Sequence, residues 1–135
     1  MLDHQIYDPE VETRPVSEQF ALDRESYQRQ VAYLMANSQF YQRKFAEAGF
    51  DTPEKIGALD DIAALPFTEK DEIRASQANF PPFGNHVAAE PDELVRIFST
   101  SGTTGVPCYL GLTKNDLEMY ATNVARGYSA AGFKR

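Results

Sequence analysis

The sequence predicts an α/β fold that is dominated by helices and carries one short, two-stranded antiparallel ribbon. Before residue 93, apolar residues recur at helical spacing in several segments. Two runs of β-branched and apolar residues follow, at 94–98 and 108–112, and each is typical of a strand. A stretch rich in Ser, Thr and Gly separates these runs, and a last helical pattern follows the second one.

The first element along the chain is an extended arm over residues 1–22. It contains Pro9, Pro15 and many polar residues, and it has no strong hydrophobic period. Asp23 is a candidate N-cap for the helical pattern that follows, and Gly49 is a candidate stop signal. The apolar stripe of this pattern consists of Tyr27, Val31, Leu34, Tyr41 and Phe45, widened by Met35, Phe40 and Ala48. A division into two helices at Asn37-Ser38 fits the pattern.

Residues 51–93 continue the helical region. A short helical piece with Pro53 near its start ends at Pro66. Thr68 is the predicted cap of a helix from Glu69 to about Ala75, whose first turn is rich in acidic residues, as the helix dipole favours. The proline-rich segment that follows cannot continue a helix or a central strand, so residues 79–93 are predicted as loop.

The third unit, residues 94–135, is predicted as strand, glycine loop, strand and helix. Thr113 is the candidate N-cap of the last helix, with Asp116 three residues later. The predicted buried stripe of this helix consists of Leu117, Tyr120, Ala121, Val124 and Tyr128. The sequence therefore divides into an arm (1–22), a helical region (23–93) and a strand–loop–strand–helix unit (94–135).

Composition and charge exclude several classes of protein. The 135 residues are 42% hydrophobic and 24% charged, which is typical of one soluble globular domain and excludes collagen and low-complexity disorder. The 13 basic and 20 acidic residues give a net charge of −7, and no basic patch indicates a nucleic-acid partner. The longest apolar stretches are too short for a transmembrane helix, so no membrane partner is expected.

The cysteine and histidine pattern indicates no metal site and no disulfide framework. Cys108 is the single cysteine, and His4 and His86 lie far apart without metal-ligand spacing. The N-terminal sequence MLDHQIYDPE has neither a basic segment nor an apolar one, so it does not match a secretory signal peptide. These features favour a reducing, cytoplasmic compartment.

The segment STSGTTGVP, residues 99–107, is the part of the sequence that carries chemistry. Gly102 and Gly105 permit unusual backbone angles and a close approach of a ligand to the main chain. Successive N–H groups in such a loop can form an anion-binding nest, and hydroxyls can donate to phosphate oxygens. The hydroxyl residues are Ser99, Thr100, Ser101, Thr103 and Thr104. The composition fits a polyphosphate site and fits equally well a Ser/Thr/Gly-rich hairpin turn without a ligand.

Two familiar phosphate-binding motifs do not match. A Walker A motif needs Gly-Lys-Ser/Thr followed directly by a helix, whereas here Gly105 is followed by Val-Pro-Cys and a strand. The dinucleotide fingerprint G-x-G-x-x-G is also absent from the sequence.

STSGTTGVP resembles the phosphate-binding loop of the adenylate-forming enzymes, which include acyl- and aryl-CoA ligases, luciferases and peptide-synthetase adenylation domains. LPFTEKDEIR, residues 65–74, resembles the corresponding segment of phenylacetate-CoA ligases. The similarity continues at residues 37–41, 83–84, 95–97 and 111–117 and extends from roughly residue 25 to the end. The resemblance implies that the chain is the mostly helical N-terminal part of such an enzyme's large domain, with the ribbon around its phosphate loop.

The resemblance also implies a two-step reaction with ATP, an aromatic carboxylate and coenzyme A. An acyl-adenylate and pyrophosphate form first, and the thiolate of coenzyme A then displaces AMP. Mg²⁺ would bridge the phosphates of ATP. Carried over by position, the residues that contact the phosphates are Ser101, Gly102, Thr103, Thr104 and Gly105.

Two positions depart from the family pattern. Cys108 stands where many relatives have Lys, and Val106 stands where phenylacetate-type enzymes commonly have Lys. The loop therefore carries no cation of its own. No His–Asp/Glu pair lies near Cys108 in the sequence, so we expect a buried strand cysteine rather than a nucleophile. We expect His86 to be a structural or solvated histidine.

Members of this family are considerably longer than 135 residues, and the segments that form their acid pocket and nucleotide contacts follow the phosphate loop. The resemblance therefore implies a piece of a ligase that is inactive alone, with the remaining ligase chain or a second copy as a partner. Two alternatives stay open: a stand-alone, non-catalytic module that binds a partner or a phosphate anion, and an adenylating enzyme whose acceptor is not coenzyme A.

Overall fold

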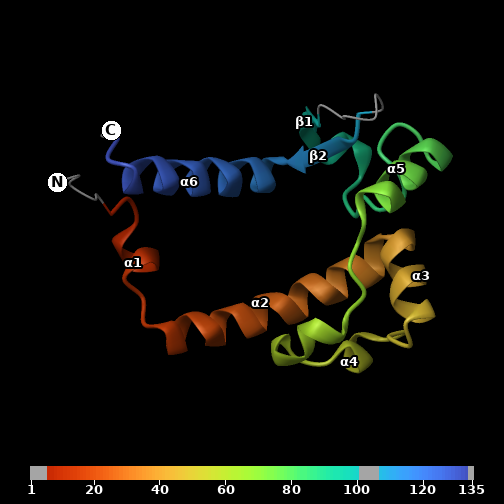
Figure 1. Ribbon diagram of the computed structural model, residues 1–135, viewed down its shortest axis with the longest axis horizontal. Coiled ribbons are helices and arrows are strands. Elements are labelled where there is room, and N and C mark those ends of the chain that lie inside the picture. Colours follow the sequence, from red (N-terminus) through yellow and green to blue (C-terminus); the bar gives the residue numbers. More distant parts are fainter. Residues whose placement is uncertain (1–5, 101–106, 134–135) are drawn as a thin grey trace.

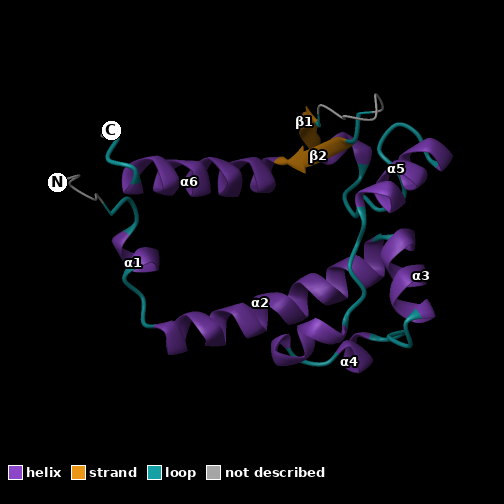
Figure 2. Ribbon diagram, viewed as in Figure 1, coloured by secondary structure: helices purple, strands orange, loops and turns teal. Residues whose placement is uncertain are grey.

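The computed structural model describes residues 6–100 and 107–133. Figure 1 shows α2 and α6 along opposite sides of the molecule, with α1 at one end and the β ribbon, α3 and α5 toward the other. Figure 2 shows that helices account for most of the described chain, as the sequence predicts. The α-helices are α1 (Pro9–Glu12), α2 (Val16–Asn37), α3 (Gln39–Glu47), α4 (Pro53–Ile56), α5 (Lys70–Asn79) and α6 (Lys114–Ala130). The 3₁₀ helices are η1 (Leu59–Ala64) and η2 (Pro91–Glu93), and the strands are β1 (Leu94–Ser99) and β2 (Tyr109–Thr113).

The prediction of an extended arm over residues 1–22 is wrong, because much of the described part of this segment is helical. Residues Pro9–Glu12 form one helical turn, capped by the Asp8 carboxylate, which accepts from the N–H of Val11 at 3.3 Å. Helix α2 begins directly after Pro15 and not at Asp23. Proline favours the first helical turn because its ring fixes φ and its missing N–H would be unpaired there. The two prolines therefore start helices here rather than preventing them.

The division between α2 and α3 is confirmed at Ser38. Its backbone is extended, with φ −119° and ψ 108°, and its hydroxyl accepts from the N–H of Tyr41 at 3.4 Å as the N-cap of α3. Gly49 follows the end of α3 with φ +90°, a conformation that side chains disfavour, and confirms the predicted stop signal.

The hydrophobic core lies where α2, α3 and α4 meet. Val31, Phe45 and Ile56 are each no more than 5% exposed and form its centre. The partly buried residues packed against them are Tyr27, Met35, Tyr41, Phe50 and Leu65. Burial of these groups removes apolar surface from water and provides the main stabilisation of the helical region.

Helix α5 differs in its bounds from the sequence prediction. Its N-cap is Glu69 instead of Thr68, because the Glu72 carboxylate accepts from the N–H of Glu69 at 2.7 Å. The helix continues to Asn79 instead of Ala75, since no proline or glycine interrupts it before Pro81.

The predicted antiparallel ribbon is confirmed, with bounds shifted by one residue. Ile97 pairs with Gly111 and Ser99 pairs with Tyr109, and an irregularity lies between Leu94 and Arg96. The predicted cap of α6 is confirmed as well. The Thr113 hydroxyl accepts from the N–H of Asp116 at 3.2 Å, and the Asp116 carboxylate accepts from the N–H of Thr113 at 2.9 Å.

The predicted buried stripe of α6 is wrong for most of its members. Tyr120 and Val124 are 52% and 37% exposed, and Ala121 and Tyr128 are exposed too, whereas Leu117 is half-buried. Helix α6 contacts the ribbon near its start, where the rings of Phe98 and Tyr120 lie 5.6 Å apart. In Figure 1 no described element runs alongside the middle of this helix. Among the described residues, the apolar stripe of α6 is therefore largely exposed.

Candidate functional site

The residues of the predicted phosphate loop lie outside the described part of the chain. These residues are Ser101, Gly102, Thr103, Thr104 and Gly105. The described chain defines the two ends of this segment, up to Thr100 on one side and from Pro107 on the other. The described part of the site consists of the elements that hold these two ends.

The two ends are joined by hydrogen bonds beyond the ribbon. The N–H of Thr100 donates to the carbonyl of Cys108 at 2.9 Å, and the N–H of Cys108 donates to the hydroxyl of Thr100 at 3.2 Å. Together with the pairing of Ser99 and Tyr109, these bonds bring the chain at 100 and 108 side by side. Cys108 is buried at 3% exposure, which confirms the buried cysteine and leaves its thiol poorly placed to act as a nucleophile.

Gln77 of α5 holds the outgoing strand. Its side-chain N–H donates to the carbonyl of Tyr109 at 2.6 Å, and its side-chain carbonyl accepts from the N–H of Tyr109 at 3.2 Å. Gln77 is buried at 8% exposure. Sequence reasoning missed this residue because a glutamine in a polar helix is usually solvated and carries no pattern of its own.

The neighbouring residue, Ser76, is the centre of a polar cluster. Its hydroxyl donates to the side-chain carbonyl of Asn85 at 2.8 Å and accepts from the N–H of Asn85 at 3.0 Å. The Nδ1 atom of His86 lies 3.1 Å from the same hydroxyl. Ser38 donates to the backbone carbonyls of Asn85 and His86 at 3.1 and 3.2 Å. The cluster fixes the segment around Asn85 between the start of α3 and α5.

His86 is half-buried within this cluster. Burial lowers the pKa of its imidazole, because the charged form loses hydration. The ring of His86 also meets that of Phe40 edge-on, with centroids 6.2 Å apart. These contacts favour the structural role over the solvated one.

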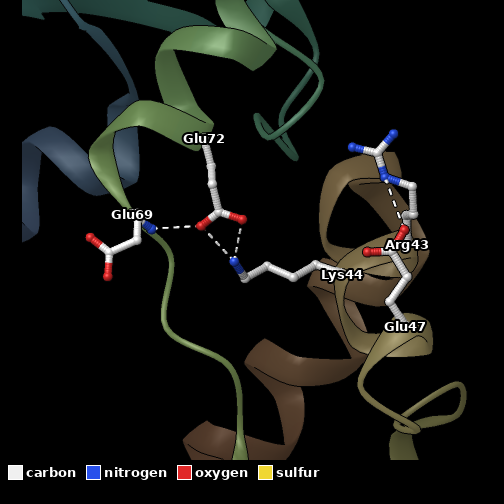
Figure 3. A network of polar contacts seen from close by, with 5 residues as sticks. All are labelled: Arg43, Lys44, Glu47, Glu69 and Glu72. Atoms are coloured by element: carbon white, nitrogen blue, oxygen red, sulfur yellow. Dashed lines mark hydrogen bonds and ion pairs between the residues drawn. The ribbon is translucent and has the colours of Figure 1, made fainter.

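An ion pair ties α5 to α3 (Figure 3). Lys44 Nζ lies 2.5 Å from Glu72 Oε1 and 2.6 Å from Oε2, and the Lys44 side chain is 13% exposed. The hydrogen bond from Lys44 and, after it, the one from the N–H of Glu69 hold the pKa of Glu72 below its ordinary value. Helix α5 is thus connected to α3 by Glu72, to the segment around Asn85 by Ser76, and to β2 by Gln77.

An open hollow of about 530 Å³ lies between α2, the segment 86–89, the ribbon and the start of α6. Several of its polar groups are already used within the protein. The Tyr33 hydroxyl donates to the carbonyl of Ala88 at 3.0 Å, and Thr113 and Asp116 cap α6. The described residues contain no group of three or more His, Cys, Asp or Glu that could hold a metal ion. No helix of the described chain is long and apolar enough to cross a membrane.

No family model matches the sequence. Three curated relatives are phenylacetate-coenzyme A ligases. The protein from Thermus thermophilus is 42% identical over 127 residues, which cover 94% of this chain and 27% of the relative. The proteins from Pseudomonas putida and Escherichia coli are 36% and 35% identical, and each match covers 98% of this chain and 29% of the relative.

Solved structures of 2-hydroxyisobutyryl-CoA ligase have the same fold over this region. The structure in the postadenylation state, in complex with 2-HIB-AMP, has a TM-score of 0.84 and 30% identity and covers 99% of this chain and 28% of that one. The structure with 2-HIB-AMP and CoA in the thioesterification state has a TM-score of 0.80 and 35% identity, over 90% of this chain and 25% of that one. The chain thus spans between a quarter and three tenths of the length of these proteins.

Proposed function

We propose that this chain, a phenylacetate-CoA ligase-like member of the adenylate-forming enzymes, is the N-terminal part of an ATP-dependent aryl- or arylacetate-CoA ligase. The observation that carries the proposal is the extent of the match: three curated relatives of one named activity are 35–42% identical over 94–98% of the chain. The antiparallel ribbon adds to it, since β1 leads into the segment that resembles the phosphate loop and β2 follows it.

The proposed ligase reaction has two steps. A carboxylate oxygen of the acid attacks the α-phosphorus of ATP, forming the acyl–phosphate bond and breaking the bond to the β-phosphate, so that pyrophosphate leaves. The thiolate of coenzyme A then attacks the acyl carbon, forms the thioester and releases AMP. In this scheme the loop orients the β- and γ-phosphates and stabilises charge that develops on the leaving pyrophosphate. The loop residues are Ser101, Gly102, Thr103, Thr104 and Gly105.

The binding of phosphate by this loop relies on groups without a formal charge. The segment 99–107 contains no Lys or Arg, and the chain carries a net charge of −7. Backbone N–H groups and hydroxyls therefore act as donors, and Mg²⁺ enters with ATP as part of the substrate complex. Cationic help comes from outside the loop.

The proposed function also assigns roles to the regions of the chain, its partner, its location and its acceptor. The helical region, which begins before residue 23 because α2 starts at Val16, holds the phosphate-loop unit 94–135. The rest of the ligase polypeptide is the expected partner, and the cytoplasm is the expected location. Coenzyme A is favoured as the acceptor because the similar 2-hydroxyisobutyryl-CoA ligase was solved with CoA and 2-HIB-AMP.

Carboxylate-dependent exchange between ATP and labelled pyrophosphate tests the proposal in the ligase polypeptide that carries this chain. The double variant Gly102→Ala/Thr103→Ala should lower the exchange rate roughly 100-fold, because donors to the polyphosphate are lost or displaced. The control is Thr122→Ala in α6, where the exposed hydroxyl donates to the carbonyl of Glu118 in the same helix at 3.0 Å.

The control should keep its exchange rate within about twofold. The 135-residue chain alone should show no exchange, because the segments for the acid and the nucleoside are not among its residues. An unchanged rate in the loop variant would refute the loop assignment, and no exchange with any aromatic acid in the carrying polypeptide would refute the ligase.

A further inference from the structure

We propose that Gln77 is a positioning residue that fixes the outgoing strand of the phosphate loop to helix α5; the inference rests on the proposed function. Its amide donates to the carbonyl of Tyr109 at 2.6 Å and accepts from the N–H of the same residue at 3.2 Å. This pair of bonds reproduces what a neighbouring strand offers to a residue of a sheet edge. Tyr109 is the first residue of β2 and lies two residues after Pro107.

The chemistry of the contact requires a side-chain amide. A glutamine presents a donor and an acceptor in one plane, whereas a carboxylate offers acceptors only and an aliphatic side chain offers neither. Gln77 is buried at 8% exposure, whereas Tyr109 is 40% exposed. Removal of the amide leaves the carbonyl and N–H of Tyr109 without these partners in a partly covered position. The contact is therefore sensitive to single-atom changes.

The helix that carries Gln77 is itself held in place. One residue before Gln77, Ser76 bonds to Asn85, and five residues before it Glu72 pairs with Lys44 of α3. The position of β2 relative to the helical region therefore depends on Gln77. Because Pro107 lies two residues before β2, the end of the loop depends on this contact as well. The loop contacts pyrophosphate in the adenylation step, and small misplacements of such groups lower rates strongly. Thioester formation takes place after pyrophosphate has left, so it should not depend on this contact.

The test compares the two half-reactions in the ligase polypeptide that carries this chain. Gln77→Leu removes both hydrogen bonds, and Gln77→Glu keeps the size but places a carboxylate against the carbonyl of Tyr109. Each should lower kcat/KM for ATP in pyrophosphate exchange about tenfold. The single-turnover transfer from preformed acyl-adenylate to coenzyme A should stay within about twofold. The control is Gln28→Leu, which removes a side-chain bond to the carbonyl of Gly57 at 2.7 Å, remote in the chain from the ribbon.

Equal losses in both half-reactions would mean that Gln77 only stabilises the fold, and would overturn the inference. An unchanged rate of pyrophosphate exchange in both variants would overturn it as well. Amide hydrogen exchange provides a readout independent of activity. The N–H of Tyr109 should exchange about tenfold faster in Gln77→Leu, while amides of α2 and α3 keep their rates. An unchanged amide hydrogen-exchange rate at Tyr109 would also overturn the inference. If the ligase polypeptide showed no pyrophosphate exchange but Gln77→Leu still accelerated amide exchange at Tyr109, the proposed function would be refuted while the contact between Gln77 and Tyr109 would stand.

Discussion

Gly84 allows the close packing of the polar cluster around Ser76. Its φ is +85°, and a Cβ at this position would lie 2.6 Å from both His86 Nδ1 and Ser76 Oγ. The cluster therefore needs glycine for two reasons, the backbone conformation and the space beside it. Few other single positions in the described chain combine these two demands.

The substitution Gly84→Ala should therefore destabilise the chain more than the same change at Gly49. Gly49 has a similar φ of +90°, but a Cβ there meets nothing within 4 Å, so its alanine variant carries backbone strain alone, about 1 kcal/mol. The contacts with Ser76 and His86 should add at least about 1 kcal/mol at Gly84. Urea unfolding of the two variants measures the difference, and equal free energies of unfolding would contradict the assigned packing.

Sequence reasoning at the scale of single residues succeeded where the signal is local. The N-cap pair Thr113–Asp116 and the stop at Gly49 were found because their partners lie within a few residues. Gln77 was missed because its partner, Tyr109, lies 32 residues away and glutamine has no preference that would reveal it. The residues of the phosphate loop were identified from motif similarity and stay a prediction.

Helix α5 joins the helical region to the ribbon, and its ion pair with α3 should make the stability of this junction depend on pH. The pKa of Glu72 is held below its ordinary value, first by the hydrogen bond from Lys44. The ionised carboxylate therefore stabilises the folded chain above the ordinary pKa of Glu. This contribution is lost as the pH falls through the lowered pKa of the folded state.

Glu72→Gln should therefore lower the free energy of unfolding at pH 7 and flatten its decrease toward pH 3. Urea titrations at steps between these pH values measure both effects. Glu47→Gln is the matched control, since Glu47 pairs with Arg43 at 3.8 Å on the exposed face of α3 (Figure 3) and a pair of this kind contributes little. The assigned role of the pair would be wrong if Glu72→Gln retained the acid dependence of the unsubstituted chain.

At the scale of elements, hydrophobic period predicted which segments are helical, and turn residues predicted the ends at Ser38, Gly49 and Thr113 but not the bounds of α5. The exception is the N-terminal segment, where Pro9 and Pro15 were interpreted as signs of an extended arm although proline is also typical of a helix start. The choice between the two depends on whether the following residues find a surface to pack on. Residues Val16–Asn37 do so through the core at Val31, which the local sequence around the prolines does not reveal.

The described chain leaves an apolar face of α6 uncovered. Tyr120, Val124 and Tyr128 lie at helical spacing and are 52%, 37% and 58% exposed, and Val95 and Ile97 of β1 are exposed as well. The chain spans 27–29% of the length of its curated relatives. In the proposed ligase, we expect the remaining polypeptide to cover this face, because an apolar stripe at helical spacing is normally packed against a neighbour. The helical period of α6 is confirmed, whereas the predicted burial of its stripe is wrong for the described chain. We expect that burial only in the ligase polypeptide.

Val124→Lys tests this interpretation by comparing two contexts. In the 135-residue chain, the side chain is already 37% exposed and lysine favours helix more than valine, so the free energy of unfolding should change by no more than about 0.5 kcal/mol. In the ligase polypeptide that carries the chain, the same substitution places a charge in a buried contact and should lower the thermal midpoint by about 5 °C. Asn123→Lys, beside it on a different face of α6, should be neutral in both contexts. An equally small effect of Val124→Lys in both contexts would show that the remaining polypeptide does not cover this face.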